Sequence, residues 1–381
     1  MIQANWLKAA AATVAVLAPG HINAAYGADR APATQIDADA DPADDSHGHP
    51  QRLARAGDDD AAEVVGTETI HVTLPARLHR HGLAVPARLV RPRWSKKVGP
   101  RPAMLVLHGS GGLTRMPKHA GEGDGPCSHE MEPQYERWAE RLAERGYVVL
   151  LPSSYEARGF CDMHVDTARI PETFDDRPEA VLGRLYDVDA ASRWLCDRPE
   201  VDCDRMGLLG FSHGATMVLL ALHWQIDHML DRYREHFGHA IDIPIPDLAP
   251  GRPEFQVGVA YYPGCGFDGV IPLATDRVSS VFDKYHPTAP IHILHGDDDP
   301  LVKHCSERFG PGTRPRQSAQ VAAHIGADDP FAIDVYHEAR HGFDNAGGSG
   351  KDEKSSNSPA DVAARDKALK VALDELDRHL R

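Results

Sequence analysis

The sequence predicts an α/β fold in which helices cover both faces of a mostly parallel sheet. Two segments of alternating polarity come first, at Thr67–Leu74 and Leu83–Val90, as expected of antiparallel leading strands. After them, short apolar runs alternate with amphipathic segments, and continuous apolar runs are typical of strands buried on both faces. Glycine-rich or polar turns follow most of these runs. Strands that alternate with helices after an antiparallel start favour a doubly wound, mainly parallel sheet.

The expected elements follow one another in a regular order. Further strands are expected at Ala103–His108, Tyr147–Leu151, Gly207–Leu209, Val257–Tyr262, Ile291–His295 and Phe331–Tyr336. Helices are expected at Glu132–Arg145, Arg177–Leu195, from Ala215 towards Tyr233, at Gln317–Ile325 and at Asp361–Leu380. No internal repeat is visible. We therefore expect one domain over residues 64–381, with residues 223–254 as an insertion that is a candidate lid.

The first sixty residues differ from the rest of the chain. Residues 1–27 resemble a secretory signal peptide, because Lys8 precedes an apolar run, Ala9–Ala18, and small residues follow with the best cleavage site at Ala25-Tyr-Gly27. Residues 28–63 are acidic and rich in alanine and proline, which predicts a disordered linker. The six cysteines agree with export to the periplasm or outside the cell, since an even number in an exported chain suggests disulfides.

Charge and histidine spacing exclude some classes of partner. The 381-residue chain has a formal net charge of −15 and no basic stripe, so nucleic acid and anionic membrane surfaces are not expected partners. The pairs His47-Gly-His49 and His79-Arg-His81 lack further ligands at convincing spacing. We interpret them as solvated histidines rather than a metal site.

A candidate nucleophile lies in Gly210-Phe-Ser-His-Gly214, between an apolar strand and a helical run. A serine at a sharp strand-to-helix turn projects its hydroxyl above the sheet, and flanking glycines give the turn the room it needs. Ser212 is the candidate nucleophile. The amide of His213 then points to where an oxyanion would form, near the positive end of the next helix.

Every other chemically suggestive feature also follows a predicted strand. The glycine-rich loop His108–Gly112 follows one strand, the acidic loop His295–Val302 another, and the segment Tyr336–Phe343 the last. Ligands of such sheets bind beyond the carboxyl ends of the strands. The chain order is therefore serine, aspartate, histidine. From the residues alone, Asp297 or Asp298 could serve as the acid in place of Asp299.

These motifs resemble the dienelactone hydrolase family of α/β-hydrolases from about Pro100 to the C-terminus. The matching residues are the Gly-Phe-Ser-His-Gly elbow, the loop His-Gly-Asp-Asp-Asp-Pro-Leu-Val and the terminal His-Gly-Phe. The resemblance implies Asp299, three residues after Gly296, as the acid and His341 as the base, with His337 as a rival base that lacks the following Gly-Phe. It also implies the α/β-hydrolase fold, no cofactor and no catalytic metal. The name-giving enzymes use a cysteine nucleophile where this chain has Ser212.

The expected function is an exported serine hydrolase that cleaves a small carboxylic ester or lactone through an acyl-enzyme. The expected oxyanion donors are the amide of His213 and that of Ser110 or Gly111. Two alternatives remain open, a peptidase of the prolyl oligopeptidase type and a catalytically silent binding protein with the same fold. The sequence does not specify an oligomeric state.

Six cysteines allow fifteen pairings. The placement of Cys127, Cys161, Cys265 and Cys305 resembles that in exported members of the family. In the implied fold, the strands before Cys127 and Cys161 are neighbours, and so are those before Cys265 and Cys305. We therefore expect the disulfides Cys127–Cys161 and Cys265–Cys305, which leave Cys196–Cys203.

Overall fold

The structure, a computed structural model, describes residues 62–79, 82–96, 98–115, 127–163, 178–223, 253–265, 287–309, 331–345 and 358–381. All of them belong to one compact unit, Ala62–Arg381. Several predicted features lie outside the described residues: the signal peptide 1–27, the linker 28–63 apart from its last two residues, the interior of the insertion 223–254, and the helix over residues 317–325. These remain predictions.

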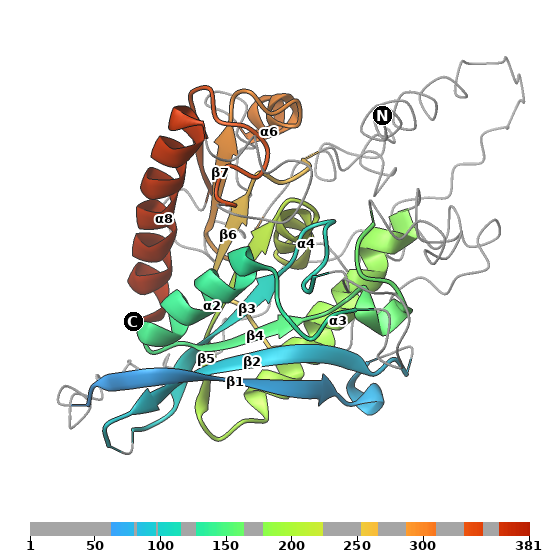
Figure 1. The fold of residues 1–381 in the computed structure, drawn as a ribbon, viewed down its shortest axis with the longest axis vertical. Helices are drawn as coiled ribbons and strands as arrows, with labels where there is room; N and C mark the ends of the chain where they lie inside the picture. The colour runs from blue at the N-terminus through green and yellow to red at the C-terminus, as the bar shows by residue number, and fades with distance from the viewer. Residues whose placement is uncertain are drawn as a thin grey trace, which may run out of the picture. The chain divides into compact units, whose positions relative to one another are not determined.

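An eight-stranded sheet runs through the described chain in the order β1-β2-β4-β3-β5-β6-β7-β8 (Figure 1). The strands are β1 (Val64–Leu74), β2 (Val85–Trp94), β3 (Arg101–Leu107), β4 (Val148–Pro152), β5 (Val201–Phe211), β6 (Val257–Tyr261), β7 (Ile291–Gly296) and β8 (Phe331–Tyr336). β2 pairs antiparallel with β1 and β4, and the pairs from β4 to β8 are parallel. The predicted α/β-hydrolase fold, with its antiparallel start, is confirmed.

Helices cover both faces of this sheet. On one face lie α3 (Pro178–Cys196) and α4 (His213–Ala221), and on the other α2 (Pro133–Glu144) and α8 (Pro359–Leu380). Successive side chains of a strand point to opposite faces. Leu208 accordingly packs in the cluster that contains α3 and α4, whereas Leu209 packs in the cluster that contains α2 and α8.

Burial follows the place of each strand in the sheet. Every residue of β4 and β6 is buried, because both strands have neighbours on each side and helices on each face. The first strand, β1, lies at the edge, and its residues alternate between more and less exposed positions. This contrast is the one that the sequence predicts from continuous and alternating apolar patterns.

The main differences from the sequence prediction concern α4, β5 and one short helix. Helix α4 begins at His213 rather than Ala215, because Ser212 is already its N-cap, and it ends at Ala221, with Leu222 as its C-cap, rather than running towards Tyr233. Strand β5 begins at Val201, well before Gly207, because its first half carries polar residues that hide the strand pattern. A short helix, α6 (Val302–Phe309), was not predicted, because its eight residues are too few and too polar to show a clear apolar period.

The structure contains the three expected disulfides, and they use all six cysteines. Cys127–Cys161 joins the loops that follow β3 and β4, and Cys265–Cys305 joins the loop after β6 to α6. Cys196–Cys203 joins the end of α3 to the start of β5. The pairing of neighbouring loops agrees with the strand order, since β3 adjoins β4 and β6 adjoins β7.

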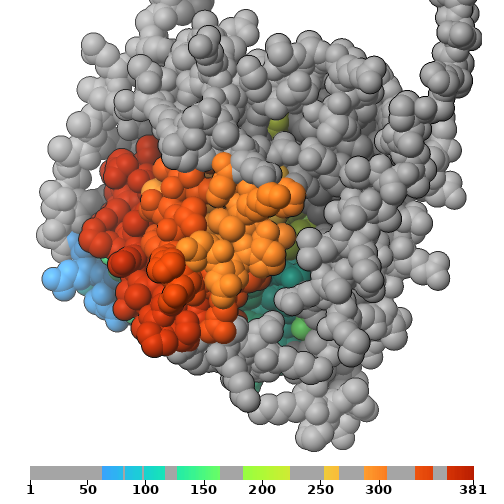
Figure 2. Space-filling model, turned by 90° about the horizontal axis from the view of Figure 1, so that it is seen from above, coloured from blue at the N-terminus to red at the C-terminus, as the bar shows by residue number. Residues whose placement is uncertain are grey.

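The last part of the described chain forms one continuous surface, in which β7, α6, β8 and α8 appear orange to red (Figure 2). The 22-residue α8 buries Ala364, Ala368, Ala372 and Leu376 towards the sheet, while most of its exposed positions are polar. None of the helices in the described residues is long and apolar enough to cross a membrane.

Candidate active site

Ser212 lies at a strained turn between β5 and α4. Its backbone has φ of 51° and ψ of −117°, a conformation that residues other than glycine rarely adopt. A Cβ at Gly210 would lie 2.3 Å from the carbonyl oxygen of Gly214, and one at Gly214 would lie 2.1 Å from that of Leu107. The two glycines therefore permit the turn that the sequence predicted.

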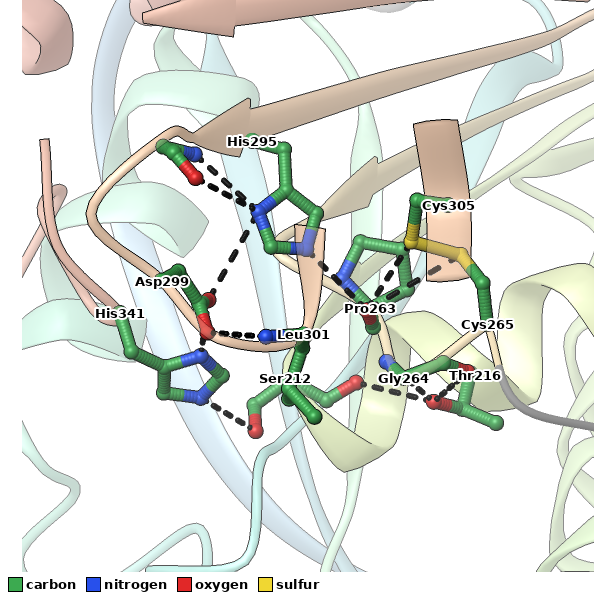
Figure 3. Close-up of a disulfide and its surroundings, with 11 residues drawn as sticks. Ser212, Thr216, Pro263, Gly264, Cys265, His295, Asp299, Leu301, Cys305 and His341 are labelled. Atoms are coloured by element: carbon green, nitrogen blue, oxygen red, sulfur yellow. Dashed lines mark hydrogen bonds and ion pairs between the residues drawn. A yellow bond between two sulfur atoms is a disulfide. The ribbon is translucent and has the colours of Figure 1, made fainter. Parts of the chain in front are cut away.

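The three predicted residues come together at the carboxyl ends of the strands (Figure 3). Nε2 of His341 lies 2.8 Å from Oγ of Ser212, and Nδ1 of His341 lies 2.6 Å from Oδ2 of Asp299. With the carboxylate as acceptor, Nδ1 carries the hydrogen and Nε2 is left to accept from the serine hydroxyl. This is the tautomer that a general base for Ser212 requires.

Asp299 is buried, with 1% of its side chain exposed. Its Oδ1 accepts a hydrogen bond from the Leu301 amide at 3.0 Å. Burial raises the pKa of Asp299, but the hydrogen bonds from His341 and from the Leu301 amide favour the carboxylate, and the pKa lies below its usual range. The carboxylate is therefore ionised where it contacts His341.

His295 packs beside Asp299 and shapes the acid loop. Its ring is fully buried, and burial lowers its pKa, so it is neutral. Nε2 donates to the carbonyl oxygen of Pro263 at 3.3 Å, and Nδ1 accepts from the Gly296 amide at 3.1 Å. A neutral ring leaves the Asp299 carboxylate to His341.

The rival residues lie apart from the serine. Asp297 and Asp298 are exposed, and Asp297 is hydrogen-bonded to His337 at 2.9 Å. His337 is 85% exposed and has no contact with Ser212 in the structure. Among the candidates for acid and base, only Asp299 and His341 are joined to the serine.

The two predicted oxyanion segments are also adjacent. His213 is the first residue of α4, so its backbone amide has no hydrogen-bond acceptor within the helix and can serve an oxyanion. A Cβ at Gly109 would lie 3.2 Å from the carbonyl oxygen of Phe211, which places the loop with Ser110 and Gly111 against the elbow. The Gly109 amide donates to the hydroxyl of Tyr135 at 2.8 Å.

Two disulfides flank this arrangement. The loop closed by Cys127–Cys161 contacts the oxyanion loop, since the Met163 amide donates to the carbonyl of Ser110 at 3.0 Å and a Cβ at Gly112 would collide with the carbonyl of Cys161. Cys265–Cys305 lies on the other side, beside the acid loop (Figure 3).

Sequence reasoning missed a buried carboxylate behind His341. Asp344 accepts hydrogen bonds from the side chains of Gln134, Trp138 and Tyr262. The ring of Tyr262 lies 4.8 Å from that of His341. Burial raises the pKa of Asp344, although its three neutral donors oppose this. The His341-Gly-Phe motif could have directed attention to the next residue, but its partners come from α2 and from the end of β6.

Sequence reasoning also missed Arg184 on α3, which is 1% exposed and hydrogen-bonded to both oxyanion segments. The interpretation of His79 as a solvated histidine is wrong, since it is buried and hydrogen-bonded to Asp187 at 3.1 Å. Within the described residues, no group of three or more histidine, cysteine or acidic side chains is arranged to hold a metal ion.

The sequence matches the dienelactone hydrolase family over residues 129–380. The chain belongs to the dienelactone hydrolase family. This segment holds Ser212, Asp299 and His341, whereas the loop with Ser110 and Gly111 precedes it. As a member of this family, the chain is a carboxylic-ester hydrolase.

A curated relative from a Bradyrhizobium species is 37% identical over 222 residues, which cover 57% of this chain and 71% of the relative. It is described as a probable 2-oxo-3-(5-oxofuran-2-ylidene)propanoate lactonase. A putative dienelactone hydrolase from Klebsiella pneumoniae is structurally similar, with a TM-score of 0.48 and 18% identity over 82% of this chain and 98% of that one. A dienelactone hydrolase-like promiscuous phosphotriesterase from metagenomic libraries gives a TM-score of 0.49 and 15% identity, over 83% of this chain and 100% of that one.

Proposed function

We propose that this dienelactone hydrolase family member cleaves a small carboxylic ester or lactone through an acyl-enzyme on Ser212. His341 acts as general base and acid, and Asp299 orients its ring. The observation that carries the proposal is the continuous hydrogen-bonded series from Asp299 through His341 to Ser212, at 2.6 Å and 2.8 Å. A serine hydroxyl needs such a base, because it is a weak nucleophile until its proton is removed during attack.

The reaction proceeds in two similar halves. Oγ of Ser212 attacks the ester carbonyl while its proton passes to Nε2 of His341, and the amides of His213 and of Ser110 or Gly111 bind the oxyanion. The intermediate collapses, and the leaving alkoxide takes the proton from His341. Water then attacks the acyl-enzyme with His341 as base again, which releases the acid and restores Ser212. In a lactone the alkoxide remains attached to the acyl group.

A lactone is the substrate class that the Bradyrhizobium relative supports, since that protein is described as a lactonase. An open-chain ester needs the same nucleophile and the same oxyanion donors. The two are separated by comparing hydrolysis of an unsaturated five-membered lactone with that of p-nitrophenyl esters of increasing acyl length. A peptide substrate beside them tests the peptidase alternative. Preference for the peptide would contradict the proposal.

The decisive variants are Ser212→Ala, His341→Ala and the double variant. Each single change should lower kcat by about 10⁶-fold, and the double variant should be little worse, because triad residues act as a unit. His337→Ala is the matched control and should keep near-normal activity, since this histidine has no contact with the serine. A fluorophosphonate probe should label the unaltered protein and not Ser212→Ala. Substantial activity in folded Ser212→Ala protein would refute the mechanism.

We also propose that the protein works in the periplasm or outside the cell. Three disulfides support this, because disulfides persist in oxidising compartments. The mature chain should then begin near Ala28. Mass spectrometry of protein from the native host tests both points, and intact Met1 on cytoplasmic protein with free thiols would contradict export.

A further inference from the structure

Arg184 is a buried cation without an ionic partner. The residue is 1% exposed, and among the described residues no carboxylate lies within ion-pair distance of its guanidinium. Asp187, one turn further along α3, is instead paired with Arg158 at 2.9 Å and with His79 at 3.1 Å. Burying an unpaired charge costs several kcal/mol. Such a cost is typical of functional sites.

The hydrogen bonds of Arg184 lead to both candidate oxyanion segments. Its Nη2 donates to the carbonyl oxygen of His108 at 2.7 Å, directly before the loop with Ser110 and Gly111. Its Nη1 lies 3.0 Å from Nδ1 of His213, whose own amide is the other candidate donor. One rigid, planar guanidinium thus spans the two segments that must hold a fixed separation.

His213 is in the protonation state that allows it to accept a hydrogen bond from Arg184. Burial, with the nearby charge of Arg184, lowers the pKa of His213 well below its usual range, so the ring is neutral. Nδ1 therefore accepts from Arg184, and the hydroxyl oxygen of Tyr155 lies 2.8 Å from the same nitrogen. The guanidinium also lies over the ring of Tyr155, at 5.3 Å.

We propose that Arg184 is a positioning residue of the oxyanion hole, which fixes the His108 loop against the Ser212–His213 elbow and adds a buried positive charge beside it. This inference rests on the proposed serine mechanism. A preorganised cation in a water-excluded region stabilises developing negative charge far more than it would in water. Arg184 does not touch the substrate, so it acts through the carbonyl of His108 and the ring of His213.

The test compares Arg184→Met with Arg193→Met on a p-nitrophenyl ester. Arg193 is the matched control, because it lies on the same helix and pairs with Asp189 near the surface. Arg184→Met should lower kcat and kcat/KM equally, by about a hundredfold, as expected when an oxyanion contact is weakened. Arg193→Met should change neither. Arg184→Lys keeps the charge but has a single ammonium for two acceptors, so we expect an intermediate loss of roughly tenfold.

An arylboronic acid separates positioning from a merely structural role. Its tetrahedral adduct with Ser212 resembles the intermediate, so its inhibition constant should rise by the same factor as kcat/KM falls. A structural defect would instead change KM or the active fraction measured by fluorophosphonate titration. Unchanged kcat and boronate affinity in folded Arg184→Met would overturn the inference. If that variant does not fold, the same two values in Arg184→Lys decide, and unchanged values there overturn it. Ser212→Ala assayed alongside tells the two failures apart, since only its activity contradicts the serine mechanism.

Discussion

Two aspartate–histidine pairs connect the same two loops of this protein. Oδ2 of Asp299 lies 2.6 Å from Nδ1 of His341, and Oδ2 of Asp297 lies 2.9 Å from Nδ1 of His337. The side chains of the first pair are 1% and 36% exposed, whereas those of the second are 42% and 85% exposed. Distance therefore does not separate the two pairs. The two pairs differ instead in the burial of the carboxylate and in the hydrogen bond between the imidazole and Ser212, which only the first pair has.

The local backbone explains why aspartates two residues apart differ so much. Asp299 begins the turn into α6, where its side chain accepts from the Leu301 amide and its carbonyl accepts from the Val302 amide. Asp297 is held at the end of β8, where its amide donates to the carbonyl of Tyr336 and its carboxylate accepts from the amide of Glu338. The carboxylate of Asp299 therefore points to His341, whereas that of Asp297 lies at the end of β8 and is exposed to water.

Between the two pairs, the largest expected difference in kcat comes from replacing Asp299 rather than Asp297 by asparagine. Asp299→Asn should lower kcat by about 10⁴-fold, because the amide no longer selects the required tautomer of His341. Asp297→Asn should leave kcat nearly unchanged, since its pair with His337 is exposed and has no contact with the serine. Ester hydrolysis by the two purified variants measures both values. A mild Asp299→Asn beside an inactive Asp297→Asn would move the acid to position 297.

The sequence predicted Ser212 and the two loops of the first pair because they follow strands, and strand ends meet at one edge of a parallel sheet. The choice of Asp299 and His341 within these loops came from the resemblance to the dienelactone hydrolase family, since Asp297 and His337 follow β7 and β8 more directly. Arg184 and Asp344 gave no comparable signal. Arg184 lies within a predicted helix, where a charged residue normally faces water. The importance of both residues depends on partners that are distant in sequence, as with Gln134 and Asp344, and a single sequence does not show such contacts.

The next largest effect is expected from removing the disulfide Cys265–Cys305, which lies beside the loop of Asp299. Cys265–Cys305 closes a separation of 40 residues, and Cys196–Cys203 one of 7. Loop-closure entropy predicts a loss of about 4 kcal/mol in unfolding free energy for Cys265→Ala/Cys305→Ala and about 2 kcal/mol for Cys196→Ala/Cys203→Ala. Only the first change should also lower kcat, because Cys305 lies on the helix that follows Asp299. Urea unfolding and ester hydrolysis measure the two effects, and an equal loss of kcat in both variants would contradict this role.

A smaller effect distinguishes the two buried carboxylates near His341. The pKa of Asp299 is lowered, so its stabilisation is present above the unfolded value near 3.9 and is lost as pH falls through the folded value. The pKa of Asp344 is raised by burial, so its contribution to stability falls as pH rises from about 3.9 through the folded value. The stability lost in Asp299→Asn should therefore grow with pH, and that lost in Asp344→Asn should shrink.

Urea unfolding of these two variants and the unaltered protein between about pH 3 and pH 7 checks the opposite slopes. Each variant is the control for the other, because both replace a buried, hydrogen-bonded aspartate, one in contact with His341 and the other connected to it only through Tyr262. Slopes of the same sign would mean that the hydrogen bonds to Asp299 do not outweigh its burial, or that burial does not raise the pKa of Asp344.

The smallest effect is on the exposed pair itself. The hydrogen bond to Asp297, followed by the charges of Asp297 and Glu338, raises the pKa of His337 above its usual range. Histidine NMR shifts recorded against pH should therefore show His337 titrating above 6.5, and Asp297→Asn should return it towards 6.5. Any stability from this pair is present below pH 6.5 and is lost as pH rises through the raised value. A His337 that titrates at or below 6.5 would show that water separates Asp297 from His337 in solution. Of the two aspartate–histidine pairs, only Asp299–His341 would then be formed.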